Sequence, residues 1–124
     1  MKSLLTTTII VSLLGTPAFA AQPPLPPEGW ADGYVIANGI RIHYWRTGGD
    51  KPVIIMAHGS SDNGLCWTNL AKELTNEYDI ILPDARGHGL SDPPTKSDSA
   101  DAQAEDLAGL IRKQIGRASC RERG

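Results

Sequence analysis

The first hydrophobic pattern in the chain is a pair of short apolar-rich runs at residues 34–37 and 40–46. The dipeptide Asn38-Gly39 separates them, and Asn-Gly between strand-like runs is a strong hairpin signal because both residues tolerate positive φ. The pattern therefore predicts two antiparallel strands. Side chains alternate between the faces of a strand, and the alternation places His43 on the more exposed face of the second strand.

Two later runs, at residues 53–57 and 80–82, are apolar throughout. Continuous apolar runs of this length are typical of strands that are buried on both faces of a parallel sheet. Each run ends in a polar loop, at residues 58–64 and 84–92 respectively. Ligands of such sheets bind beyond the carboxyl ends of the strands, so both loops are expected to border a binding site.

An apolar stripe at helical spacing follows each polar loop. The first consists of Trp67, Leu70, Ala71, Leu74 and Tyr78, and the second of Ala104, Leu107, Ala108, Ile111 and Ile115. Asp62 or Asn63 is expected to cap the first helix. Cys66, near its start, is expected to pack as a small hydrophobe and not to form a disulfide with Cys120. The order predicts an α/β fold, in which an antiparallel hairpin precedes parallel strands that alternate with helices.

The N-terminal region is predicted to lie outside this fold. Residues 1–20 combine Lys2, an apolar run and a final Ala-Phe-Ala, which is the pattern of a secretory signal peptide. The apolar run is shorter than the ~20 residues that span a bilayer, so no stable membrane anchor is expected. Residues 21–32 are rich in proline and predict an extended linker. The mature protein is expected to be exported, to a periplasm or the medium.

Composition excludes several classes of protein. The 124 residues are 40% hydrophobic and 21% charged, which is typical of a globular protein. The net charge is −2 and no basic stripe is present, so a nucleic-acid partner is not expected. No metal ion or cofactor is expected either.

Two motifs resemble a known family. His58-Gly59 follows an apolar run, and the string DARGHGLS runs from Asp84 to Ser91 after the next one. Together with Trp67, these motifs resemble the N-terminal part of an α/β-hydrolase over residues 33–114. The resemblance implies an incomplete α/β-hydrolase sheet.

The resemblance also implies a role for the first polar loop. In acyl transfer, backbone N–H groups stabilise the negative charge that develops on the attacked carbonyl oxygen, and the loss of one donor costs on the order of 3 kcal/mol. In this family the loop after the third strand supplies one such donor. Here that donor is expected to be the backbone N–H of Ser60, with Gly59 permitting a close approach to the substrate.

The other motif residues are expected to be structural and not catalytic. The histidines and the arginine are expected to hold the two loops together, and the glycines to permit tight turns. The set consists of His58, Gly59, Asp84, Arg86, Gly87, His88 and Gly89.

No catalytic nucleophile, acid or base is found. The G-x-S-x-G elbow is absent, and in this family the acid and the base follow the nucleophile along the chain. The chain is therefore expected to be inactive alone and to belong to a longer hydrolase that acts on a small ester-like molecule. Ser60-Ser61 replaces the aromatic-Pro pair frequent in epoxide hydrolases and the Asn frequent in haloalkane dehalogenases, which favours a serine esterase, lactonase or carbon–carbon hydrolase. A small non-catalytic ligand-binding domain and a non-hydrolytic relative remain the alternatives.

The last ten residues differ in composition from the rest. The segment IGRASCRERG resembles the translation of a common sequencing adapter. Residues 115–124 are therefore expected to be an artefactual tail.

Overall fold

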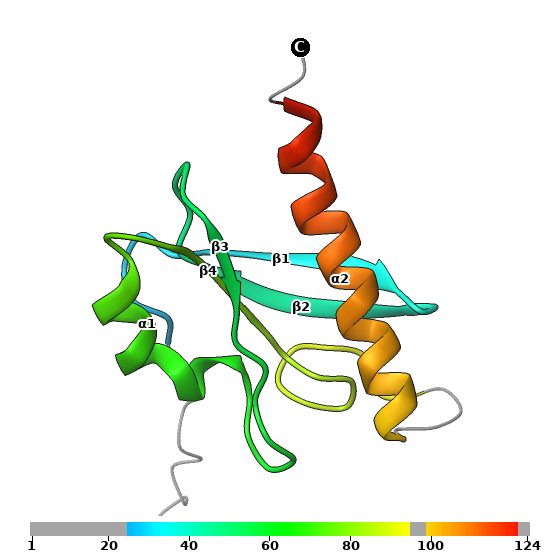
Figure 1. Cartoon of the computed structure of the whole chain (residues 1–124). Helices are drawn as coiled ribbons and strands as arrows, with labels where there is room; N and C mark the ends of the chain where they lie inside the picture. The colour runs from blue at the N-terminus through cyan, green and yellow to red at the C-terminus, as the bar shows by residue number, and fades with distance from the viewer. Residues whose placement is uncertain (1–24, 95–98, 122–124) are drawn as a thin grey trace, which may run out of the picture.

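The computed structural model describes residues 25–94 and 99–121, with side chains through residue 116, and the predicted signal peptide at 1–20 lies outside them. The elements are β1 (Ala31–Ala37), β2 (Ile40–Arg46), β3 (Val53–Ile55), the 3-10 helix η1 (Gly64–Trp67), α1 (Thr68–Leu74), β4 (Asp79–Pro83) and α2 (Ala100–Arg121). The strands form one mixed sheet in the order β1-β2-β4-β3 (Figure 1). Only β3 and β4 are parallel, and β2 is antiparallel to both of its neighbours.

The Asn-Gly hairpin is confirmed. Asn38 and Gly39 have φ values of 48° and 79° and connect the pair Ala37↔Ile40. The strands then pair residue by residue up to Ala31 and Arg46, so β1 begins inside the segment that was predicted to be a linker.

The predicted exposure of His43 is wrong. Its side chain is 0% exposed, because a second layer of structure covers the face of β2 that points away from Ile42. Nδ1 of its ring lies 2.8 Å from Oδ2 of Asp84, which places the start of the loop after β4 against this face. The rings of Tyr34 and Trp45 flank the imidazole at centroid distances of 5.0 and 4.7 Å.

Strand β4 lies at the centre of the packing. Ile81 packs in one apolar cluster with Leu110 of α2, whereas Ile80 and Leu82 pack in a second cluster with Ala71 of α1. Because neighbouring side chains of a strand point to opposite faces, α1 and α2 cover opposite faces of the sheet. The prediction that this strand is buried on both faces is confirmed.

Strand β3 differs from its prediction. It forms the edge of the sheet, spans three residues instead of five, and its side chains are only half-buried. The run that was predicted to continue the strand to Ala57 leaves the sheet after Met56, whose N–H donates to Ile81.

The first helical segment begins where the sequence indicates. Asn63 is its N-cap, and the Asn63 side chain accepts a hydrogen bond from the N–H of Leu65. A single turn of 3-10 helix leads into the short helix α1, which ends at Leu74, one turn before Tyr78. Cys66 is exposed and has a free thiol, so the expectation that it packs as a small hydrophobe is wrong.

The face that the second helix turns to the sheet was predicted only in part, because Leu107 of the predicted stripe packs against the core but Ile111 and Ile115 do not. Leu110 is fully buried, whereas Ile111 and Ile115 are 38% and 37% exposed. A Cβ placed on Gly109 would lie 2.9 Å from the Cβ of Ala37, so the helix crosses the hairpin at its closest point there. Among the described residues, no helix is long and apolar enough to cross a membrane.

Candidate functional site

The two polar loops lie side by side at one edge of the sheet. Strands β3 and β4 are parallel, in the register Ile54↔Ile80, so both loops leave the sheet at the carboxyl ends of these strands (Figure 1). The indole of Trp67 donates to the carbonyl of Ala57 at 3.1 Å and fixes the start of the first loop against η1. The sheet thus brings together two sequence motifs that are separated by the helical segment.

Asp84 is the centre of the second loop. Its side chain is buried, and its Oδ1 accepts a hydrogen bond from the N–H of Gly64 at 2.7 Å. Its Oδ2 accepts from the N–H of Leu90 at 3.0 Å and from Nδ1 of His43 at 2.8 Å. One carboxylate therefore joins the loop to β2, to η1 and to its own far end.

Burial alone would raise the pKa of Asp84, because a charged carboxylate loses its hydration in the interior. The hydrogen bonds from His43, Leu90 and Gly64 favour the ionised form more strongly, and the pKa of Asp84 lies below its ordinary value. The group is accordingly a structural anion at neutral pH. It has the donors it needs within the fold.

Two glycines permit this loop to close around the carboxylate. Gly87 and Gly89 have φ values of 74° and 50°, in the left-handed region that other residues avoid. A Cβ on Gly89 would lie 2.3 Å from Oδ2 of Asp84, so a side chain there would collide with the carboxylate. Gly59, in the first loop, has no atom within 4 Å of such a Cβ and does not have positive φ.

His58 connects the two loops. Its Nε2 accepts a hydrogen bond from the N–H of Ala85 at 2.9 Å, and its Nδ1 lies 2.6 Å from the carbonyl oxygen of Gly59. A nitrogen that accepts from an N–H carries no proton of its own, and a carbonyl oxygen needs a donor. The hydrogen-bond pattern thus assigns the proton of the neutral ring to Nδ1.

His88 makes a second connection between the loops. Its Nε2 lies 2.7 Å from the carbonyl oxygen of Ser60, and its Nδ1 lies 3.0 Å from that of Arg86. The rings of His58 and His88 meet edge to face at a centroid distance of 5.2 Å. Both histidines therefore contact the backbone of residues 58–60.

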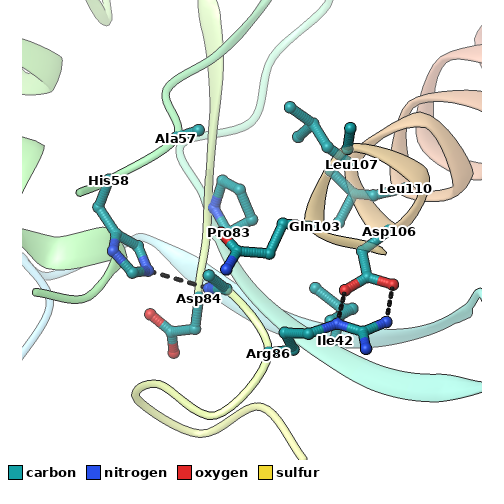
Figure 2. Close-up of a pocket in the computed structure, with 12 residues that line it drawn as sticks. Ile42, Ala57, His58, Pro83, Asp84, Arg86, Gln103, Asp106, Leu107 and Leu110 are labelled. Carbon is teal, nitrogen blue, oxygen red and sulfur yellow. Dashed lines mark hydrogen bonds and ion pairs between the residues drawn. The ribbon is translucent and has the colours of Figure 1, made fainter. Parts of the chain in front are cut away.

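Arg86 ties the second loop to helix α2. Its Nε and Nη2 donate to the two carboxylate oxygens of Asp106 at 2.6 and 2.7 Å, and Figure 2 shows this paired arrangement. Both side chains are buried. A bidentate pair of this kind has a fixed geometry, and removing one partner would break both hydrogen bonds.

A cavity of about 190 Å³ lies between this ion pair, the strand ends and α2. Figure 2 shows His58 and Pro83 on one side of it and Leu107 on the other. Its wall is mainly apolar, and its polar residues are His58, Asp84, Arg86, Gln103 and Asp106. Small-molecule sites have this composition, with few polar groups in an apolar wall.

The structure brings most of the predicted site residues together. His58, Asp84 and Arg86 line the cavity, whereas Ser60 is exposed and outside its wall. In the described part of the chain, the N–H of Ser60 makes no hydrogen bond. No group of three side chains within the described ranges could hold a metal ion.

Sequence reasoning missed two contributors, His43 and Asp106. Asp106 is the buried partner of Arg86, although the sequence indicates only that Asp106 lies in the acidic first half of a helix. The histidine is the buried partner of Asp84, although strand alternation predicts an exposed position. Neither residue lies within a recognisable motif, so only the folded arrangement reveals these contacts.

A family model described as the alpha/beta hydrolase fold matches residues 52–119, which is more than half of the chain. The chain therefore belongs to the α/β-hydrolase fold family. Its sheet is a part of that fold, as the motifs predicted, and its relatives are hydrolases.

Three relatives illustrate the range of the family. Epoxide hydrolase 1 of Caenorhabditis elegans is 35% identical over 95 residues, which cover 76% of this chain and 23% of that protein. N-formylmaleamate deformylase of Pseudomonas putida is 38% identical over 78 residues, which cover 62% of this chain and 29% of that protein. The crystal structure of the Cif epoxide hydrolase from Acinetobacter nosocomialis matches with a TM-score of 0.69 and 25% identity, over 74% of this chain and 29% of that one. The chain thus spans about a quarter of the length of these proteins.

Proposed function

We propose that this chain supplies the oxyanion loop of an exported hydrolase that acts on small ester-like molecules. The catalytic nucleophile, acid and base are then contributed by parts of the protein outside these 124 residues. The proposal depends on one observation above all. The N–H of Ser60 is unused by the described residues, and it lies in a loop at the carboxyl end of β3.

The chemistry of this proposal is electrostatic. A fixed backbone N–H donates to the oxygen that becomes negative in the transition state, and it costs no reorganisation at the moment of reaction. The buried anion Asp84 and the ion pair of Arg86 already have their partners, so neither is free to act as a base. Their contribution is to hold the second loop, which in turn holds the first.

The test uses the protein extended to the natural end of its reading frame, assayed with an activated ester. In that protein Ser60→Pro removes the N–H, and we expect kcat to fall by about 10²–10³. Ser60→Ala is the matched control, because it keeps the N–H and removes only the hydroxyl, and it should retain full activity. An unchanged kcat in Ser60→Pro would exclude this N–H as an oxyanion donor.

The chain of 124 residues should show no turnover in the same assay. Ester hydrolysis that a serine-directed phosphonate abolishes would contradict the proposal, since it would locate a nucleophile within these residues. A reading frame that stops without an elbow would instead favour a non-catalytic ligand-binding domain.

Export is a separate proposal, based on Lys2, the apolar run and the Ala-Phe-Ala sequence that ends at Ala20. N-terminal sequencing of the protein from an expressing bacterium should begin at Ala21. A cytoplasmic protein that still begins with Met1 would contradict it.

A further inference from the structure

Two imidazole rings contact the backbone of the proposed oxyanion loop. The ring of His58 lies 2.6 Å from the carbonyl oxygen of Gly59, and the ring of His88 lies 2.7 Å from that of Ser60. These carbonyls belong to the two successive peptide groups that flank Ser60. The first contact is made within the loop and the second comes from the neighbouring loop.

The first contact determines where the N–H of Ser60 points. The carbonyl of Gly59 and the N–H of Ser60 belong to one planar peptide group, and this group is trans. In a trans peptide the C=O and N–H bonds are antiparallel. Because His58 binds the carbonyl, the N–H of Ser60 must point away from the imidazole.

The direction of this contact depends in turn on the second loop. The N–H of Ala85 donates to Nε2 of His58, and this leaves the proton of the neutral ring on Nδ1, where the carbonyl of Gly59 accepts it. If the proton were on Nε2, the lone pair of Nδ1 would face the carbonyl oxygen of Gly59, and this peptide group would lose its hydrogen bond. The backbone of the loop after β4 thus controls the donor in the loop after β3.

His88 fixes the other side of the same residue. Its Nε2 lies 2.7 Å from the carbonyl oxygen of Ser60, and a proton on this nitrogen forms a hydrogen bond to that oxygen. Rotation of the peptide group after Ser60 would break this bond. The edge-to-face packing of the two rings, at 5.2 Å, couples the two contacts.

We propose that His58 and His88 are positioning residues that together fix the direction of the Ser60 N–H; this pair of contacts is called the histidine clamp below. The inference rests on the proposed function only for its catalytic consequence, because the geometry of the clamp is a property of the chain itself. The two motif histidines then share one role, in which both act through the backbone of residues 59–60.

The first experiment is NMR on the 124-residue chain and does not depend on catalysis. Ring ¹⁵N shifts should show His58 with its proton on Nδ1 and an unprotonated Nε2 at neutral pH. The residual dipolar coupling of the Ser60 N–H should change in His58→Gln and in His88→Ala, but not in Ser60→Ala. A ring of His58 protonated on Nε2, or a coupling that no histidine variant changes, would overturn the proposal.

The second experiment separates positioning from simple support of the loops. In His58→Asn the amide nitrogen occupies the place of Nδ1 and can still donate to Gly59, whereas in His58→Gln the terminal oxygen can only replace the acceptor for Ala85. In the extended protein we expect kcat to fall at least tenfold in His58→Gln, with KM within threefold, and to recover to within about threefold of wild type in His58→Asn.

A merely structural role predicts a different result, in which both variants lose activity in parallel with their melting temperatures. That outcome would refute the clamp while leaving the proposed function intact. If instead Ser60→Pro leaves kcat unchanged, the proposed function fails, and the tautomer and dipolar couplings still decide whether the clamp exists.

Discussion

The carboxylate of Asp84 is expected to be among the most sensitive positions for the stability of this chain. The substitution Asp84→Ala removes the acceptor of three donors: Nδ1 of His43, the N–H of Gly64 and the N–H of Leu90. The first two belong to buried residues. Leu90, which carries the third donor, is 52% exposed, so its N–H can form a hydrogen bond with water instead.

The magnitude follows from the two buried donors. Each buried donor without a partner costs about 1–3 kcal/mol, so Asp84→Ala should lower the free energy of unfolding by about 2–6 kcal/mol. Native domains have only about 5–15 kcal/mol in total, and small ones lie near the lower end. The variant should therefore be largely unfolded under conditions in which the wild type is folded.

Two further variants calibrate the result. Asp84→Asn keeps one oxygen for Gly64 but sets an NH₂ group against the N–H of Leu90, so we expect a smaller loss, about 2 kcal/mol. Asp92→Asn is the matched control, because this aspartate lies in the same loop as Asp84 and forms an exposed ion pair with Arg41 of β2. Exposed pairs contribute about 0–1 kcal/mol, and the control should stay within that range.

The assay is urea unfolding followed by tryptophan fluorescence. The ring of Trp45 packs edge to face on His43, so it reports directly on the environment of Asp84. The midpoint should shift while the slope stays constant, which identifies a change in stability and not in the unfolded state. A loss below about 1 kcal/mol for Asp84→Ala would refute the reasoning, since it would mean that the loop reorganises and satisfies its donors without the carboxylate.

The same residue predicts a pH dependence. Its folded pKa lies below its ordinary value, because the hydrogen bonds from His43, Leu90 and Gly64 outweigh burial. The contribution of Asp84 is thus fully present above the ordinary pKa and is lost as the pH falls through the lower, folded pKa. Stability of the wild type should decrease across this acidic range, and the decrease should be shallower in Asp84→Asn. Equal slopes for both proteins would assign the acid sensitivity to other carboxylates.

Two more predictions concern single positions. Gly89→Ala should cost about 2–4 kcal/mol, because its Cβ would lie 2.3 Å from the Asp84 carboxylate and φ is positive, whereas Gly59→Ala should stay within about 0.5 kcal/mol in the same urea titration. Although Cys66 is exposed, partial desolvation and the neighbouring carboxylate of Asp62 raise the pKa of its thiol. Its alkylation, followed at neutral pH by peptide mass spectrometry, should therefore be slower in the folded chain than in urea and faster in Asp62→Asn. Equal rates in all three samples would contradict this assignment.

The hairpin could be predicted from the sequence because its determinants are local. Asn38 and Gly39 adopt the positive φ values that the turn requires, and this turn sets the register of both strands. The apolar run of β4 was equally informative, since both of its faces are covered by helices. In these places the pattern of side chains and the tertiary environment agree.

The contact face of α2 could not be predicted from apolar spacing alone. The helix carries apolar residues on adjacent faces: Leu107 and Leu110 pack against the core, whereas Ile111 and Ile115 are exposed. Gly109 favours the observed face, because its lack of a side chain lets the helix approach Ala37 of the hairpin. This selection depends on a contact between residues that are far apart in the sequence, and no periodicity reveals it.

The buried position of His43 could not be predicted either, because it also depends on a contact with a distant part of the chain. Alternation along β2 correctly assigned it to the face opposite Ile42, but alternation does not say what covers that face. Part of the cover is the loop that begins at Asp84, whose carboxylate accepts a hydrogen bond from the imidazole of His43. A polar residue on a strand was thus interpreted as exposed because its partner comes from a distant part of the chain.

The carboxylate and the histidine clamp are linked through one peptide group. Asp84 holds the first residue of the loop, and the next residue, Ala85, provides the N–H that sets the tautomer of His58. Loss of the carboxylate should therefore release the N–H of Ala85 and, with it, the preference of His58 for a proton on Nδ1. In Asp84→Asn, which should remain folded, the ring ¹⁵N shifts of His58 should move toward a mixture of the two tautomers. A pure Nδ1–H tautomer in that variant would show that the clamp is independent of the buried anion.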